Sequence, residues 1–226
     1  MKLLNSIRND MKFNEQTITR SRCIKLGHFI SGIILATFVL LHLYNHSLSM
    51  FGVDQHLAFM TDARKIYRNQ VVELILMCAI SFQLLSGIYL FVRKRKLAHS
   101  VFDRLQIYSG LYLAIFFLVH LSAVWVGRLY LKLDTNYYFG VAGLTHFPFN
   151  LFFIPYYALA ILSFFTHIAA VHHSKMKSNV FGISPVKQSI YILVVGVILT
   201  CLILSALIHA WSSGMMPQAY KVLIGK

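Results

Sequence analysis

Five stretches of this sequence are apolar over about 20 residues or more, the length that an α-helix needs to cross the hydrocarbon core of a membrane. They cover approximately Leu26–Ser49, Val71–Val92, Leu105–Val126, Asn150–Val171 and Gln188–Trp211. Spanning backbone must satisfy its hydrogen bonds internally, and these stretches lack the alternation of barrel strands, so each is predicted to be a helix. The predicted fold class is an all-α membrane protein, a bundle of five transmembrane helices.

The composition agrees with an integral membrane protein. Hydrophobic residues make up 58% of the chain and charged residues only 12%, and the mean hydropathy is +0.65. Such values lie outside the range of ordinary soluble domains. The connections between the stretches are short, so we expect one transmembrane domain over residues 26–211, with a polar segment at 1–25 and a short tail at 212–226.

The positive charge of the chain, formally +14, predicts its orientation. Fourteen of the 21 Lys and Arg residues lie before the first span, between the second and third, or between the fourth and fifth. By the positive-inside rule the N-terminus is cytoplasmic and the C-terminus lies outside, and we expect the inner membrane of a bacterium. The basic residues flank spans, as the run Arg93–Lys96 does, so their expected partner is membrane lipid and not nucleic acid.

A thirteen-residue phrase occurs twice, as SGIILATFVLLHL at Ser31–Leu43 and as SGLYLAIFFLVHL at Ser109–Leu121, with eight identical positions. Each copy carries a histidine eleven residues after its serine, His42 in the first and His120 in the second. Eleven residues close about three helical turns, so serine and histidine share a face. The first and third spans run in the same direction and hold these histidines at matched depth, so we predict that the two imidazoles face each other.

The residue types around this histidine pair favour haem over zinc. Zinc would need further ligands, and no Cys, Asp or Glu lies at that depth, whereas haem b needs only two axial imidazoles in an apolar slot. The Ser-Gly pairs that open the phrases, Ser31-Gly32 and Ser109-Gly110, are small enough to make room for the macrocycle. Close helix packing alone would explain any one of these glycines, but it does not explain the repeat.

The remaining histidines are less informative. His167 lies near the cytoplasmic end of the fourth span, hence in the opposite leaflet, and is expected to face the bundle interior. His46 is one turn from His42 and could replace it as a ligand. The others are expected to be hydrated residues of the interfaces and loops: His28, His56, His99, His146, His172, His173 and His209.

These features resemble the membrane cytochrome b subunit of succinate dehydrogenase and quinol:fumarate reductase, in its five-helix, di-haem form. The first and third spans of that family carry a Ser/Thr-Gly pair followed ten residues later by an axial histidine, as Gly32 is by His42 and Gly110 by His120. The stretch PYYALAILSFFTH, which ends at His167, is similar to the fourth span of the family, where a ligand of the second haem lies.

The resemblance implies a cofactor and partners. It implies haem b, electron exchange with quinone, and a flavoprotein and an iron-sulfur subunit docked on the cytoplasmic side. The chain has no nucleotide-binding glycine fingerprint and no iron-sulfur cysteine set, so that chemistry belongs to other chains. The chain is then an electron-transfer subunit without a catalytic site of its own.

The second span departs from the family pattern because it contains no histidine. The family position for the second axial ligand falls on Gly87, so His167 lacks its expected partner. Three outcomes stay open: the second haem is absent, it is five-coordinate with a vacant face over Gly87, or Gln83 or His28 fills the gap. One haem is therefore expected, and two are an alternative.

Other functions and the quinone site also stay open at this point. The chain could be the cytochrome of another oxidoreductase, a quinol oxidase module with an open haem at His167, or a haem-free scaffold or transporter. Ser31, Arg22 and Glu73 are candidates for contacting a quinone. Each has a structural alternative, which for Glu73 is an ion pair with Arg68.

Overall fold

The computed structural model, which describes residues 2–211 and 216–226, confirms the predicted all-α architecture. Five of its helices are long and apolar enough to span a membrane, so the chain is a multi-pass membrane protein. They are α1 (Lys2–Ser47), α3 (Gln70–Lys94), α4 (Val101–Trp125), α6 (Asn150–Lys175) and α7 (Pro185–Trp211). Each contains most of a predicted apolar stretch.

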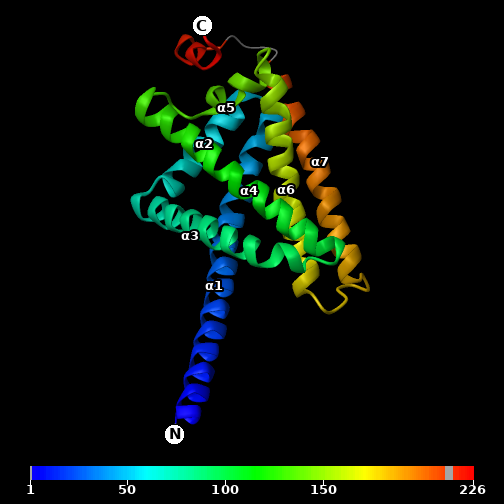
Figure 1. Ribbon diagram of the computed structural model, residues 1–226. Coiled ribbons are helices and arrows are strands. Elements are labelled where there is room, and N and C mark those ends of the chain that lie inside the picture. The colour runs from blue at the N-terminus through cyan, green and yellow to red at the C-terminus, as the bar shows by residue number, and fades with distance from the viewer. Residues whose placement is uncertain (1, 212–215) are drawn as a thin grey trace.

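Contacts between neighbouring helices join the five long helices into a closed ring, and Figure 1 shows the bundle from the side, with α1 projecting from it. Contacts join α1 to α3, α3 to α4, α4 to α6, α6 to α7, and α7 back to α1. The face where α1 enters the bundle is called here the amino-terminal face, and the face where the chain ends is called the carboxy-terminal face. In a ring of this kind, side chains from several helices face a common interior.

Local sequence sets where the helices begin. Asn69 caps α3, because its side chain accepts a hydrogen bond from Val71 N at 3.0 Å. Ser100 and Asp103 form a reciprocal capping box at the start of α4. By contrast, α1 has no break between its polar beginning and its apolar part, so the predicted segment 1–25 continues directly into the first span.

Three shorter helical elements, which the sequence did not reveal, cover the carboxy-terminal face. They are α2 (Val53–Tyr67), α5 (Tyr137–Thr145) and η4 (Gln218–Ile224). Tyr137 of α5 is 1% exposed and donates a hydrogen bond to Leu207 O at 3.0 Å, so α5 closes the bundle over α7. Residues 212–215 of the predicted tail lie outside the described residues, and η4 packs against α5.

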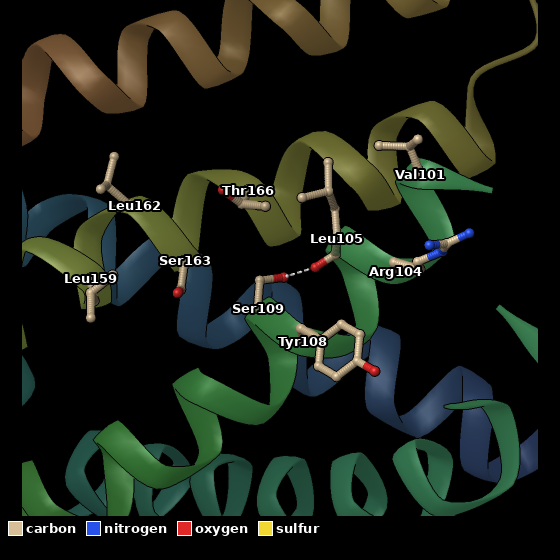
Figure 2. A pocket seen from close by; sticks show the side chains of 9 residues that line it. All are labelled: Val101, Arg104, Leu105, Tyr108, Ser109, Leu159, Leu162, Ser163 and Thr166. Carbon is tan, nitrogen blue, oxygen red and sulfur yellow. Dashed lines mark hydrogen bonds between the residues drawn. The ribbon is translucent and has the colours of Figure 1, made fainter. Parts of the chain in front are cut away.

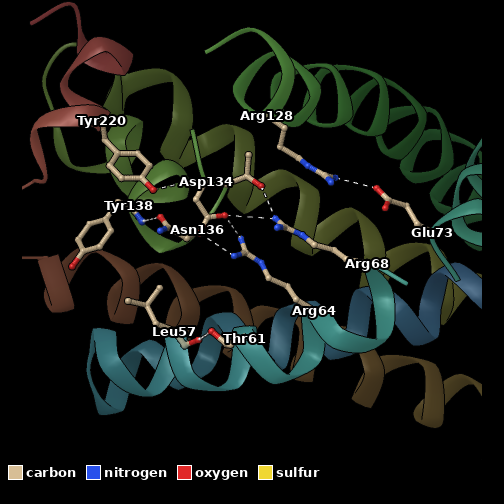
Figure 3. A network of polar contacts seen from close by, with 11 residues as sticks. Leu57, Thr61, Arg64, Arg68, Glu73, Arg128, Asp134, Asn136, Tyr138 and Tyr220 are labelled. Carbon is tan, nitrogen blue, oxygen red and sulfur yellow. Dashed lines mark hydrogen bonds and ion pairs between the residues drawn. The ribbon is translucent and has the colours of Figure 1, made fainter. Parts of the chain in front are cut away.

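An ionic network ties these covering elements together (Figure 3). Arg64 of α2 contacts both carboxylate oxygens of Asp134, at 3.0 and 2.9 Å. Tyr220 of η4 donates a hydrogen bond to Asp134 O at 2.9 Å. Asp134 therefore links α2 to η4 although the three residues lie far apart in the sequence.

Glu73 takes part in a neighbouring ion pair, with a partner that differs from the one considered above. Its carboxylate lies 3.0 Å from Arg128, which follows α4, and not beside Arg68. Arg68 instead donates to Thr135 Oγ1 at 3.2 Å and lies 3.7 Å from Asp134. The structural interpretation of Glu73 thus holds with a different arginine, because the end of α4 passes over the start of α3.

Close helix packing holds α6 against α7. A Cβ atom added to Gly196 of α7 would overlap the side chain of Phe165 on α6. Phe165 is buried together with Phe164 and Ile203 in the largest apolar cluster of the protein. The absence of a side chain at position 196 is therefore what lets the two helices approach.

Candidate functional site

His42 of α1 and His120 of α4 come together inside the bundle. Their ring centroids are 6.3 Å apart and their planes are inclined by 65°. Two imidazoles that bind one metal ion from opposite sides, each at about 2 Å, place their centroids roughly 6 Å apart. The centroid separation of the pair is thus compatible with bis-histidine ligation.

Two phenylalanines one turn earlier hold these imidazoles in place. Phe38 stacks on His42 with centroids 5.9 Å apart and an interplanar angle of 14°. Phe116 stacks on His120 at 5.0 Å and 13°. Both pairs have the i, i+4 spacing that brings side chains together on a helix, and both phenylalanines are identical positions of the repeated phrase. The phrase thus contains the phenylalanines that support the rings as well as the two histidines.

His46 adds a third imidazole to this site. Its Nε2 atom lies 3.1 Å from His42 Nε2, and the two ring centroids are 4.5 Å apart. His42 consequently has His46 on one side and His120 on the other, which makes it the central member of the group. Metal binding through His42 Nε2 would replace its contact with His46.

His56 is buried, and the expectation of a hydrated loop histidine is wrong. Its side chain is 1% exposed, with Nδ1 lying 3.0 Å from Ser49 Oγ and Nε2 lying 3.2 Å from Asn45 Nδ2. The ring lies edge-on to Tyr137 at 5.3 Å. Burial lowers the pKa of His56 from 6.5 to about 4, so the imidazole stays neutral at physiological pH.

The Ser-Gly pairs lie in the half of the bundle toward the amino-terminal face, three turns away from the His42 pair. Ser31 donates a hydrogen bond to Gln83 Oε1 of α3 at 2.6 Å, and Gly32 lies against the same glutamine side chain. Ser109 and Gly110 lie against His167 instead. The pairs thus belong to a second group of residues.

His167 faces the bundle interior, as expected. Its Nδ1 atom lies 3.0 Å from Gln106 O and 3.3 Å from Ser109 Oγ. A carbonyl oxygen only accepts hydrogen bonds, so Nδ1 carries the proton and Nε2 keeps its lone pair. A Cβ atom on Gly110 would lie 3.0 Å from His167 Cε1, which shows how closely the ring packs on α4.

His28, which is partly exposed, lines the same cavity as His167. The cavity has a volume of about 470 Å³ and is walled by α1, α3, α4 and α6. His28 Nδ1 lies 2.8 Å from Ser86 Oγ, and Nε2 lies 3.2 Å from Gln83 Nε2. Of the groups considered as partners of His167, both His28 and Gln83 line this cavity, as does Gly87.

A shallower groove of about 460 Å³ lies between α4 and α6 (Figure 2). Ser109 belongs to its wall and donates a hydrogen bond to Leu105 O at 2.5 Å. Arg104 and Tyr108 lie on the same wall, while Ser163 lies opposite on α6 (Figure 2). Ser109 therefore separates the groove from His167.

Comparison with known proteins gave no match to a family model, to a curated protein or to a solved structure. What the site can bind must therefore be inferred from its own side chains. Among the residues that the structure describes, no three His, Cys, Asp or Glu side chains form a group that could hold a metal ion. Paired imidazoles are, however, the axial set of a b-type haem, whose other four ligands come from the porphyrin.

Proposed function

We propose that this chain is a membrane cytochrome b subunit that carries electrons between a partner dehydrogenase or reductase and the quinone pool. The observation that supports it most directly is the 6.3 Å separation of the His42 and His120 rings within an apolar bundle. His42 and His120 would hold a haem b through their imidazole nitrogens. The haem supplies one-electron chemistry, which the side chains of this protein do not have.

The surrounding residues tune such a site through position and burial. Phe38 and Phe116 fix the ring orientations, and Tyr157 of α6 closes the site edge-on to His120 at 6.3 Å. Imidazole binds a metal in its neutral form, through the nitrogen that carries no proton.

The proposal extends to partners and location. Resemblance to the succinate dehydrogenase and fumarate reductase cytochromes supports a flavoprotein and an iron-sulfur subunit at the amino-terminal face, which is the basic face of the bundle. Membrane quinone is the exchangeable electron carrier on this proposal. The charge asymmetry supports the inner membrane of a bacterium, with the N-terminus in the cytoplasm and the C-terminus outside.

The test is a reduced-minus-oxidised optical spectrum of the purified protein, with the haem quantified as its pyridine haemochrome. We expect a low-spin b-type spectrum that loses one haem per chain in His42→Ala and in His120→Ala. His209→Ala, which removes a histidine from the end of α7, is the matched control and should keep the haem.

Two results would refute the proposal. A protein without a haem absorption band would favour a scaffold or transporter. Full low-spin haem in both His42→Ala and His120→Ala would show that these residues are not the ligands. If haem is present, the activity of the isolated complex with succinate, fumarate and quinone analogues then distinguishes a succinate dehydrogenase or fumarate reductase from another oxidoreductase.

A further inference from the structure

We propose that the groove between α4 and α6 is a binding site for one anionic glycerophospholipid of the leaflet at the amino-terminal face (Figure 2). The groove has a volume of about 460 Å³. The inference goes beyond electron transfer and does not depend on a haem. It assigns the groove to a single retained lipid, which is a stronger statement than general contact of the spans with the membrane.

The groove lies on the outer side of the bundle, where lipid has access to it. Val101 and Tyr108 of its α4 wall are 71% and 62% exposed, and Leu159 of its α6 wall is 47% exposed. The opposite face of α4 carries Gln106 and Gly110, which line the interior cavity instead. The side chains of the groove therefore face the membrane and not the interior of the bundle.

Arg104 supplies a positive charge at the end of the groove that is nearest to the amino-terminal face. Its guanidinium donates to His99 O at 3.3 Å, and within the described part of the chain it forms no ion pair. The neighbouring acid, Asp103, is engaged with Ser100 in the capping box of α4. A guanidinium binds phosphate with two parallel hydrogen bonds, and the end of a span is where lipid phosphates lie. Arg104 thus has both the charge and the position to hold a phosphate.

Three hydroxyl groups lie next to Arg104 along the groove, on Tyr108, Thr166 and Ser163. Ser109 satisfies its own hydroxyl by donating to Leu105 O at 2.5 Å, but the other three make no hydrogen bond to any residue that the structure describes. A hydroxyl in a membrane without a partner costs free energy. The ester oxygens of a glycerolipid, which lie just below its phosphate, are acceptors for such donors.

The far end of the groove is apolar. Leu159 and Leu162 lie there, beyond Ser163, at the opposite end from Arg104 (Figure 2). Leu159 is seven residues from Thr166 on α6, which places it about 10 Å deeper in the bilayer. The order of charge, hydroxyl groups and leucines matches the order of phosphate, esters and acyl chain in a phospholipid. A transmembrane helix of another chain has its carbonyl groups already bonded, so it offers fewer acceptors to these hydroxyls.

Native mass spectrometry of the purified full-length protein, titrated with dioleoyl-phosphatidylglycerol or dioleoyl-phosphatidylcholine, tests the proposal. We expect one phosphatidylglycerol per chain, bound more tightly than phosphatidylcholine. Arg104→Gln should weaken binding of phosphatidylglycerol about fivefold. Arg95→Gln makes the same charge change at an exposed position of the same face and should leave the affinity unaltered.

A second pair of variants tests the hydroxyl groups. Thr166→Val keeps the shape of the side chain and should weaken binding of phosphatidylglycerol about two- to tenfold. Thr37→Val is its control, because Thr37 lies on another helix and donates to its own backbone, to Ile33 O at 3.0 Å. The control should bind the lipid as the wild type does.

Three results would overturn the proposal. Equal affinity of the wild type for the two lipids would show that the groove does not select a headgroup. Equal losses in Arg104→Gln and Arg95→Gln would show that the basic face attracts anionic lipid without the groove. A dimer without bound lipid, which Leu159→Trp dissociates, would assign the groove to a second copy of the chain.

Discussion

The burial of His56 predicts how stability depends on pH. Its side chain is 1% exposed, and burial lowers its pKa from 6.5 to about 4. Between these two values the unfolded chain binds a proton that the folded chain excludes, so the free energy of unfolding decreases as the pH falls. At about 1.4 kcal/mol per pH unit, the loss across this window reaches about 3 kcal/mol.

Thermal unfolding of the full-length protein in detergent, followed by circular dichroism from above pH 6.5 down to about pH 4, measures this dependence. His56→Gln is the comparison, because glutamine is polar but does not titrate. The variant should be less stable than the wild type at neutral pH, where Asn45 and Ser49 lose part of their hydrogen bonding, and its stability should fall less steeply with acid. Equal slopes for the two proteins would refute the assignment.

Two further predictions concern packing and charge. Gly196→Ala should destabilise the protein by about 1–3 kcal/mol, because the added carbon overlaps Phe165 of α6. Gly140→Ala adds a carbon with no atom within 4 Å, so it should stabilise α5 by about 0.5–1 kcal/mol. Arg64→Ala should lower the stability of the protein by about 1–3 kcal/mol, because the Arg64 side chain is only 14% exposed and pairs with Asp134. Lys65→Ala removes an exposed ion pair and should change stability by less than about 1 kcal/mol. Thermal melts of the four variants decide both, and equal effects within either pair would contradict the reasoning.

Much of the fold follows from hydrophobic length alone. An apolar stretch of about 20 residues has few alternatives to a spanning helix, so the five spans were predictable. The covering helices α2 and α5 were not, because both are too short to span a membrane and so carry no comparable signal. Their burial depends on contacts such as Tyr137 to Leu207 O, which join residues far apart in the sequence.

Some histidine positions were likewise predictable from the sequence, and others were not. The repeated phrase brought His42 and His120 to one depth, and the structure places their rings together. Sequence position misjudged His56, because a place in a connection between spans does not say whether the side chain is buried. The stacking partners Phe38 and Phe116 were visible as shared positions of the phrase, and the i, i+4 rule would have found them.

The sequence by itself determined the helical class, the five spans and the pairing of two histidines at equal depth, because helix periodicity and the thickness of a membrane leave little freedom. Only the tertiary structure decided how the helices are rotated and which neighbours they have. Those rotations set Ser31-Gly32 against Gln83 and Ser109-Gly110 against His167. The physical reason is that the contacts of a side chain depend on which other helices pack against its face of the helix, and those helices come from distant parts of the chain.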